Sequence, residues 1–141
     1  MNIQKAVSST KEWKKNFDKF KADFTKEKQR IKLREKKLKK MLDNLNKTSL
    51  VTKPELKKKQ ENQFRKEKID FERYVQDQNA EFGKQEKEMT QKILVKMMKI
   101  IKKIGEEKKY TMILEQKVVL YHDKGNDLTS IATRAYDRAN K

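Results

Sequence analysis

The sequence predicts an α+β protein that is mostly helical, with a long antiparallel coiled-coil hairpin attached to a small β-containing body. Charged residues make up 42% of the chain and hydrophobic residues 34%, against about 25% and 45–50% in an average globular domain, so one large compact core is not expected. Apolar residues nevertheless recur at heptad spacing over the first hundred positions. A segment rich in β-branched and aromatic residues follows them.

The first long helix is expected between about residues 10 and 47. Its apolar residues fall seven positions apart, and Phe20 and Met41 occupy the second position of the same seam. Glu27 and Arg34 stand where hydrophobic residues belong, so the middle of the coil should be comparatively soft. The predicted seam residues are Phe17, Phe24, Ile31, Leu38 and Leu45.

A second long helix should start after the interruption "TSLVTKPE". Thr52 is the predicted N-cap, with Pro54 in the first turn. The seam of this helix comprises Phe64, Phe71, Val75, Phe82 and Met89, followed by an apolar stripe of Ile93, Met97, Ile100 and Ile104 that should face more than one neighbour. Because the connection is short, we expect residues 10–109 to form a hairpin arm with its tip near residues 48–53.

The amino-acid composition changes after residue 109. "YTMIL" and "VVLYH" predict two strands around a tight turn, and Asp127 is positioned to cap a closing helix. Two strands alone are not stable, so this end should assemble with other chains. We therefore expect residues 1–9 and 110–141 to form an oligomerisation body. Its predicted contact residues are Val118, Val119, Leu120, Tyr121, Leu128, Ile131, Ala132 and Ala135.

The net charge of +17 favours partners that carry negative charge. Residues 10–109 hold 32 Lys or Arg and 17 Asp or Glu, which is +15 of that total. A candidate gripping surface near the tip consists of Lys36, Lys37, Lys39, Lys40, Leu50, Val51, Lys57, Lys58 and Lys59. A lysine run on a long helix is usually only a solvated face, and no aromatic residues for base stacking interleave with these runs. Specific nucleic-acid recognition is not expected, whereas nonspecific binding to nucleic acid or anionic surfaces stays open as the alternative function.

Catalytic, metal and cofactor sites are not predicted. The chain has no cysteine, and His122 is its sole histidine. Asp127 is explained as a helix cap, and Asp123 and Asp137 as exposed residues. No apolar run approaches the roughly 18 residues of a membrane span. No secretory apolar segment follows Met1, so a signal peptide is expected to be absent or already removed.

The order of segments resembles the Skp, or OmpH-like, periplasmic chaperones of Gram-negative bacteria. "MNIQKAVSST", the hairpin, "YTMILEQKVVLYHDKGNDLT" and "SIATRAYDRANK" follow one another as in that family. The closing segment is the most specific part, because the coil matches only as generic heptads. The family's opening strand, normally just before the part equivalent to Ile3 to Val7, has no counterpart here. Prefoldin-like chaperones also use helical arms, but they place their strands between the two helices.

The resemblance implies a jellyfish-shaped homotrimer, in which three β-containing bodies join and three arms surround a cavity. It implies an ATP-independent holdase of the periplasm that binds unfolded outer-membrane β-barrel proteins. The gripping surface would then be the client-binding part of the arm. Anionic lipid or lipopolysaccharide is left open as a further partner.

Overall fold

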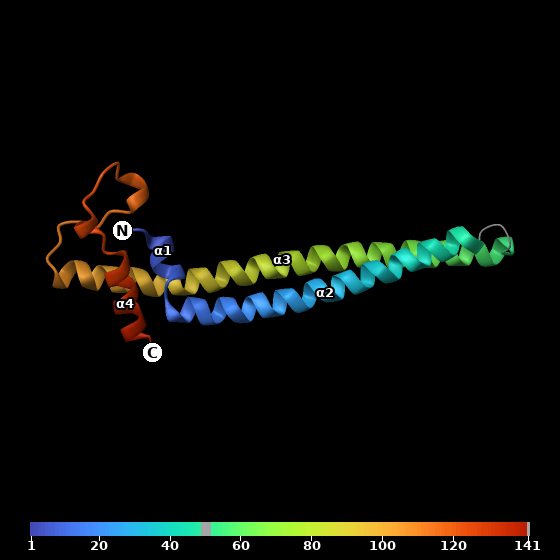
Figure 1. The fold of residues 1–141 in the computed structure, drawn as a ribbon, viewed down its shortest axis with the longest axis horizontal. Helices are drawn as coiled ribbons and strands as arrows, with labels where there is room; N and C mark the ends of the chain where they lie inside the picture. The colour runs from blue at the N-terminus through green and yellow to red at the C-terminus, as the bar shows by residue number, and fades with distance from the viewer. Residues whose placement is uncertain (49–51, 141) are drawn as a thin grey trace. The chain divides into compact units, whose positions relative to one another are not determined.

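The computed structural model describes residues 1–48 and 52–140, which divide into two compact units (Figure 1). One unit comprises Met1–Lys21 with Gln85–Lys141, and the other comprises Ala22–Lys84. The helices are α1 (Ile3–Ser8), α2 (Lys11–Thr48), α3 (Pro54–Glu107) and α4 (Thr129–Ala139), with short 3-10 turns at Gln116–Val118 and Lys124–Asn126. The two long helices confirm the helical hairpin that the heptads predict.

In the unit formed by Ala22–Lys84, α2 and α3 run side by side in opposite directions (Figure 1). The ring of Phe24 packs edge-on against Phe82, with centroids 5.2 Å apart. Phe24 is nonetheless 42% exposed, because two helices alone cannot enclose a large ring. The other predicted seam positions of this unit are half-buried, namely Ile31, Leu38, Leu45, Phe64, Phe71, Val75 and Phe82. Phe17 and Met89, in the other unit, are also half-buried.

The start of α3 differs in detail from the prediction. Pro54 is its first residue, as expected, but the Thr52 hydroxyl donates to the carbonyl of Thr48 at the end of α2 (2.7 Å). The carbonyl of Lys53 accepts the first helical bond, from the Lys57 amide (3.0 Å). The predicted Thr52 N-cap is therefore wrong. A proline at the first position leaves one amide fewer to satisfy, which frees Thr52 to bond backwards.

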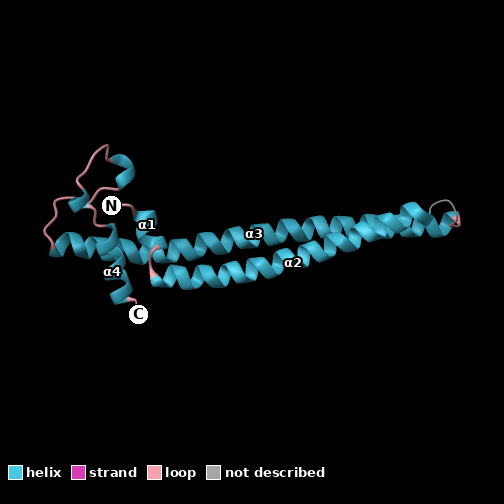
Figure 2. Cartoon of the chain, viewed as in Figure 1, coloured by secondary structure: helices cyan, strands magenta, loops and turns pink. Residues whose placement is uncertain are grey.

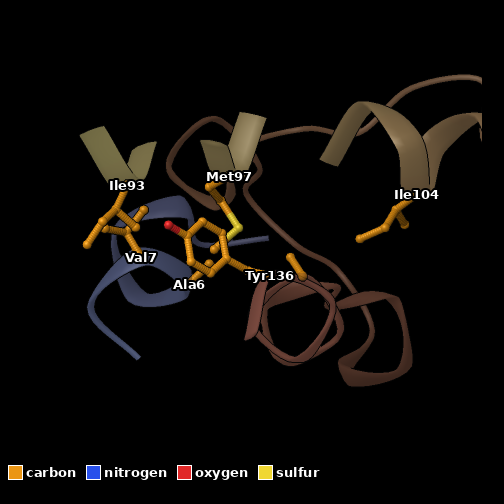
Figure 3. Packing of buried hydrophobic residues seen from close by; sticks show 7 residues of the cluster. Ala6, Val7, Ile93, Met97, Ile104 and Tyr136 are labelled. Carbon is orange, nitrogen blue, oxygen red and sulfur yellow. The ribbon is translucent and has the colours of Figure 1, made fainter. Parts of the chain in front are cut away.

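The core of the other unit lies where α1, α3 and α4 meet (Figure 3). Its members are buried: Ala6 and Val7 from α1, Ile93, Met97 and Ile104 from α3, and Ala132 and Tyr136 from α4. The stripe on α3 thus faces more than one neighbour, as its apolar density predicts. Helix α1 was not predicted. A signal for it exists, because Asn2 is a common N-cap residue and its Oδ1 accepts from the Lys5 amide (2.9 Å).

Helix α3 ends in a left-handed residue that is not glycine. Lys109 has φ 53°, and its amide donates to the carbonyl of Glu106 (3.2 Å). The amide of Tyr110 donates to the carbonyl of Gly105 (3.0 Å). This pair of bonds forms a Schellman motif, which satisfies carbonyls at the helix end and usually requires glycine at the position of Lys109.

The two predicted strands are absent: among the residues that the structure describes, 110–128 form loops and 3-10 turns, and no strand is drawn (Figure 2). The segment "EQK" between them does turn, since Gln116 and Lys117 belong to the 3-10 turn at Gln116–Val118. A lone pair of short strands lacks the neighbouring strands that would stabilise it. Part of the backbone pairs with the chain start, since the Met1 ammonium donates to the Leu114 carbonyl (3.0 Å) and the Gln116 amide donates to the Met1 carbonyl (2.7 Å).

Candidate functional surfaces

A polar network joins the three helices at the base of the hairpin. The Tyr136 hydroxyl of α4 donates to Oε2 of Glu12 on α2 (2.5 Å). Lys96 Nζ of α3 donates to both oxygens of the same carboxylate, at 3.0 and 3.1 Å. The hydrogen bond from Tyr136, followed by the contacts of Lys96, lowers the pKa of Glu12 despite its partial burial. Burial and the carboxylate raise the pKa of Tyr136, so its hydroxyl stays a donor.

Further hydrogen bonds fix α4 to the first residues of the chain. Asp137 Oδ1 accepts from the amide of Lys11 (2.9 Å), which is the first residue of α2. The Thr133 hydroxyl donates to the carbonyl of Ala6 (3.1 Å), and the Thr129 hydroxyl oxygen accepts from the Asn2 amide (2.8 Å). Helix α4 therefore has a fixed position against α1 and the start of α2.

Asp127 bonds to the start of α4, but the N-cap residue is Leu128, which makes no side-chain cap bond, so the cap predicted at Asp127 is displaced by one position. Asp127 Oδ1 accepts from the amide (3.0 Å) and hydroxyl (2.5 Å) of Thr129, the first residue of the helix. These bonds lower the pKa of Asp127. Nearby, His122 Nδ1 lies 3.0 Å from the carbonyl oxygen of Asp123, and both residues belong to the loop before α4. This arrangement stabilises the loop and the helix start.

The segment between α3 and α4 presents the most exposed apolar side chains of the described chain. We call this the loop surface, comprising Tyr110, Met112, Leu114, Val118, Leu120 and Tyr121. Leu120 is 106% exposed, so its whole side chain faces solvent. A concentration of exposed apolar side chains in one segment is typical of a region that contacts another molecule.

The predicted body residues do not all share this surface. Val119 and Leu128 are half-buried and line a hollow of 290 Å³ beside Met1 and Ile113. Ala132 is fully buried, so its side chain packs in the core of the single chain. Ala135 is half-buried against that core, whereas Ile131 is exposed. The exposed loop surface is thus separate from the buried face of α4.

The candidate gripping surface lies on both long helices. Lys36, Lys37, Lys39 and Lys40 are exposed on α2, Lys58 and Lys59 are exposed on α3, and Lys57 is half-buried. Leu50 and Val51 lie outside the described residues. Exposed apolar residues accompany the lysines in the same unit, which the heptad analysis did not single out: Leu33, Leu42, Leu56 and Ile69.

The two polar residues in the predicted seam form a defined cluster. Glu27 is 7% exposed, and its carboxylate accepts hydrogen bonds from the Tyr74 hydroxyl and from Arg30 (3.2 Å). The guanidinium of Arg34 lies over the Tyr74 ring, 3.9 Å from its centroid. The bond to Glu27 raises the pKa of Tyr74. The sequence showed the interruption of the seam, but it did not show that Tyr74 on α3 would meet it.

The described part of the chain shows neither a membrane-spanning helix nor a metal-binding group. No helix there is long and apolar enough to cross a membrane. Across residues 1–48 and 52–140, no group of three or more histidine, cysteine, aspartate or glutamate residues is arranged to hold a metal ion.

Both the sequence and the fold of this chain are similar to those of known proteins. A model of the family described as outer membrane protein (OmpH-like) matches residues 1–135. Among curated proteins, none gives a significant match. Among solved structures, the chain is similar to a candidate outer membrane chaperone (OmpH-like) from Caulobacter crescentus, with a TM-score of 0.84 and 15% sequence identity. The alignment covers 95% of this chain and 79% of the other. At that identity the likeness concerns the fold.

Proposed function

Since this chain belongs to the OmpH-like family of outer membrane proteins, we propose that it is an ATP-independent holdase that binds unfolded outer-membrane proteins and prevents their aggregation. The observation that carries the proposal is the mixed surface of the unit formed by Ala22–Lys84. Exposed Leu33, Leu56 and Ile69 lie on helices that also expose many lysines.

This surface suits an unfolded client for physical reasons. An unfolded β-barrel chain offers apolar segments and acidic groups together but no fixed shape. Dispersed apolar side chains remove small areas of the client from water, each contributing at about 25 cal/mol per Å². Lysines attract the acidic groups over longer distances and speed the encounter. Many weak contacts of both kinds hold a client without selecting one sequence.

The loop surface supports a proposal about assembly. The segment from Tyr110 to Tyr121 exposes apolar side chains in each chain, and its strand-forming composition calls for neighbouring strands. We propose that these segments from three copies pair in a homotrimeric body, so that the hairpins enclose a space for the client. The site of action proposed for such a trimer is the periplasm, where anionic lipid or lipopolysaccharide would be a further partner.

The proposal is tested by diluting a urea-unfolded outer-membrane β-barrel protein into buffer with and without this protein, in the absence of ATP. Light scattering should be suppressed, and the complex should persist at high salt because apolar contacts hold it. The variant Leu33→Gln/Leu56→Gln/Ile69→Gln should lose protection and should keep its helix content, since these side chains are exposed. The charge variant Lys58→Gln/Lys59→Gln should slow capture and retain protection.

The alternative function is nonspecific binding to nucleic acid. It is favoured by the net charge of +17. Phosphate neutralisation would make affinity for duplex DNA fall by roughly 10³ or more between 50 and 200 mM salt for six or more contacts. If DNA binds tightly while scattering is not suppressed at either salt, the holdase proposal fails and the alternative replaces it.

A further inference from the structure

A basic hollow of 920 Å³ lies in the unit formed by Met1–Lys21 and Gln85–Lys141. It is separate from the gripping surface, and neither the heptad pattern nor the basic runs indicate it. Three helices contribute cations to its lining: Lys11 and Lys15 come from α2, Lys96 from α3, and Arg134 and Arg138 from α4. Residues far apart in the sequence are thus brought to one concave surface.

The lining has a surplus of positive charge. Its two carboxylates are already engaged, because Glu12 accepts from Tyr136 and Lys96, and Asp137 accepts from the Lys11 amide. The side chains of Lys11, Lys15, Arg134 and Arg138 make no ion pair with any residue that the structure describes. Like charges that converge on one hollow repel each other, and a bound anion would relieve that repulsion.

The spacing of these cations fits a ligand with several oxyanion groups. Lys11 and Lys15 are four residues apart on α2, and Arg134 and Arg138 are four residues apart on α4, so each pair lies on one helix face about 5–6 Å apart. The planar guanidinium fork binds phosphate oxygens in pairs. The hydrogen bonds of Thr133, Tyr136 and Asp137 hold α4 in place. The backbone that carries the two arginines therefore has a fixed position.

We propose that this hollow is a binding site for an oligophosphate, supplied either as a free anion or as the phosphorylated headgroup of a lipid. Its volume falls in the range of about 300–1,000 Å³ that is usual for ligand pockets and exceeds what a single phosphate fills. The inference does not rest on the holdase proposal, because none of the gripping-surface residues lines the hollow.

The test uses the full chain and two matched double variants. Arg134→Gln/Arg138→Gln removes the arginines of the hollow, and Arg65→Gln/Arg73→Gln removes two exposed arginines of α3 elsewhere. Inorganic tripolyphosphate is titrated by calorimetry into each protein. Wild type and the α3 variant should bind alike, whereas the hollow variant should bind about tenfold more weakly or worse, because two charge-assisted contacts are lost. All four arginines are exposed, and circular dichroism checks the fold.

Vesicles of phosphatidylcholine, with and without cardiolipin, a lipid that carries two phosphates, distinguish the two sources. Flotation with acidic vesicles that depends on Arg134 and Arg138, without tripolyphosphate binding, assigns the site to a lipid headgroup. Lys15→Gln, which removes a lining cation of α2, should weaken whichever ligand binds. Equal losses in the two double variants would overturn the proposal in favour of diffuse charge. Absence of saturable binding to both probes would overturn it as well.

Discussion

Tyr136 on α4 and Glu12 on α2 are joined by a 2.5 Å hydrogen bond across 124 positions of sequence. Tyr136 is fully buried, and Lys96 contacts the same carboxylate from α3. The hydroxyl keeps its proton because burial raises its pKa, and the carboxyl stays ionised because the hydrogen bond lowers its pKa. One carboxylate therefore links the three helices at the base of the hairpin.

Removing the hydroxyl should destabilise this base. Tyr136→Phe keeps the ring in the core and deprives Glu12 of its shortest bond, so the free energy of unfolding should fall by about 1–2 kcal/mol. Thermal unfolding followed by circular dichroism measures this. Tyr121→Phe is the matched control, because Tyr121 is exposed and its hydroxyl donates to Asp123 within the same loop. Equal shifts in the two variants would show that the bond to Glu12 does not stabilise the unit.

Glu12 should also make stability depend on pH. Its pKa in the folded chain is lowered below the ordinary value of 4.5, so its contribution is present above that value and is lost as pH falls through the folded pKa. The difference in unfolding free energy between wild type and Glu12→Gln should be constant near neutral pH and shrink below 4.5. Urea unfolding at several pH values measures it. A difference that grows on acidification would contradict the assignment.

The end of α3 offers a stabilising substitution. Lys109 adopts φ 53°, which costs a residue with a Cβ more than it costs glycine. Lys109→Gly should raise the free energy of unfolding by about 0.5–1 kcal/mol after the entropy of glycine is counted. Lys108→Gly, one position earlier and with an ordinary φ, should instead lower it. Chemical denaturation of both variants decides, and a loss of stability in Lys109→Gly would argue against the Schellman geometry.

Glu27 should stabilise the hairpin, although it interrupts the apolar seam. Glu27→Ala leaves the Tyr74 hydroxyl and Arg30 without their acceptor, at an expected cost of about 1–2 kcal/mol. Glu35→Ala on the same helix removes an exposed carboxylate and matches the change in helix propensity. Helix content during thermal unfolding should separate the two variants. If they melt together, the cluster is only a surface contact.

Assembly should depend on Leu120 without the fold depending on it. Leu120 is fully exposed in the single chain, so Leu120→Lys should leave circular dichroism unchanged. If the loop surface joins three copies, burial of this leucine contributes about 1.5–3 kcal/mol per chain, and the lysine should shift native mass from trimer to monomer. Leu33→Lys, an exposed leucine of α2, is the control and should leave the mass unchanged. A trimer that tolerates Leu120→Lys would place the boundary elsewhere.

The hairpin was predictable from the heptad spacing of its apolar residues. The family was predictable from the order of the segments along the chain. Phe24 and Phe82 stand at heptad positions, and they meet in the structure. The family match over residues 1–135 confirms the resemblance read from the closing segment. The small helix α1 was missed because six residues carry too little periodicity to stand out.

The strands and the polar contacts were beyond sequence reasoning for different reasons. Val118 and Leu120 have strand chemistry, but a strand needs partners that local composition does not supply. Glu12, Tyr74 and Tyr136 look like ordinary helix residues, and their roles depend on contacts with other helices. The basic hollow is a product of the same tertiary contacts, since its cations Lys15, Lys96 and Arg134 stand far apart in the sequence.

The bonds between the first twelve residues and α4 also set an order of events during folding. The pairs Asn2 with Thr129, Ala6 with Thr133 and Glu12 with Tyr136 span 124 to 127 positions, whereas α2 and α3 meet across a short turn. Closing the loop of more than 120 residues between the chain start and α4 costs more chain entropy than closing the short turn. The α2–α3 hairpin should therefore form first, and α4 should dock last. On the ribosome, the α1 residues Ala6 and Val7 would stay without their α4 neighbours until α4 emerges. A nascent chain would therefore expose the core residues of α1 and α3 to solvent until α4 has been synthesised.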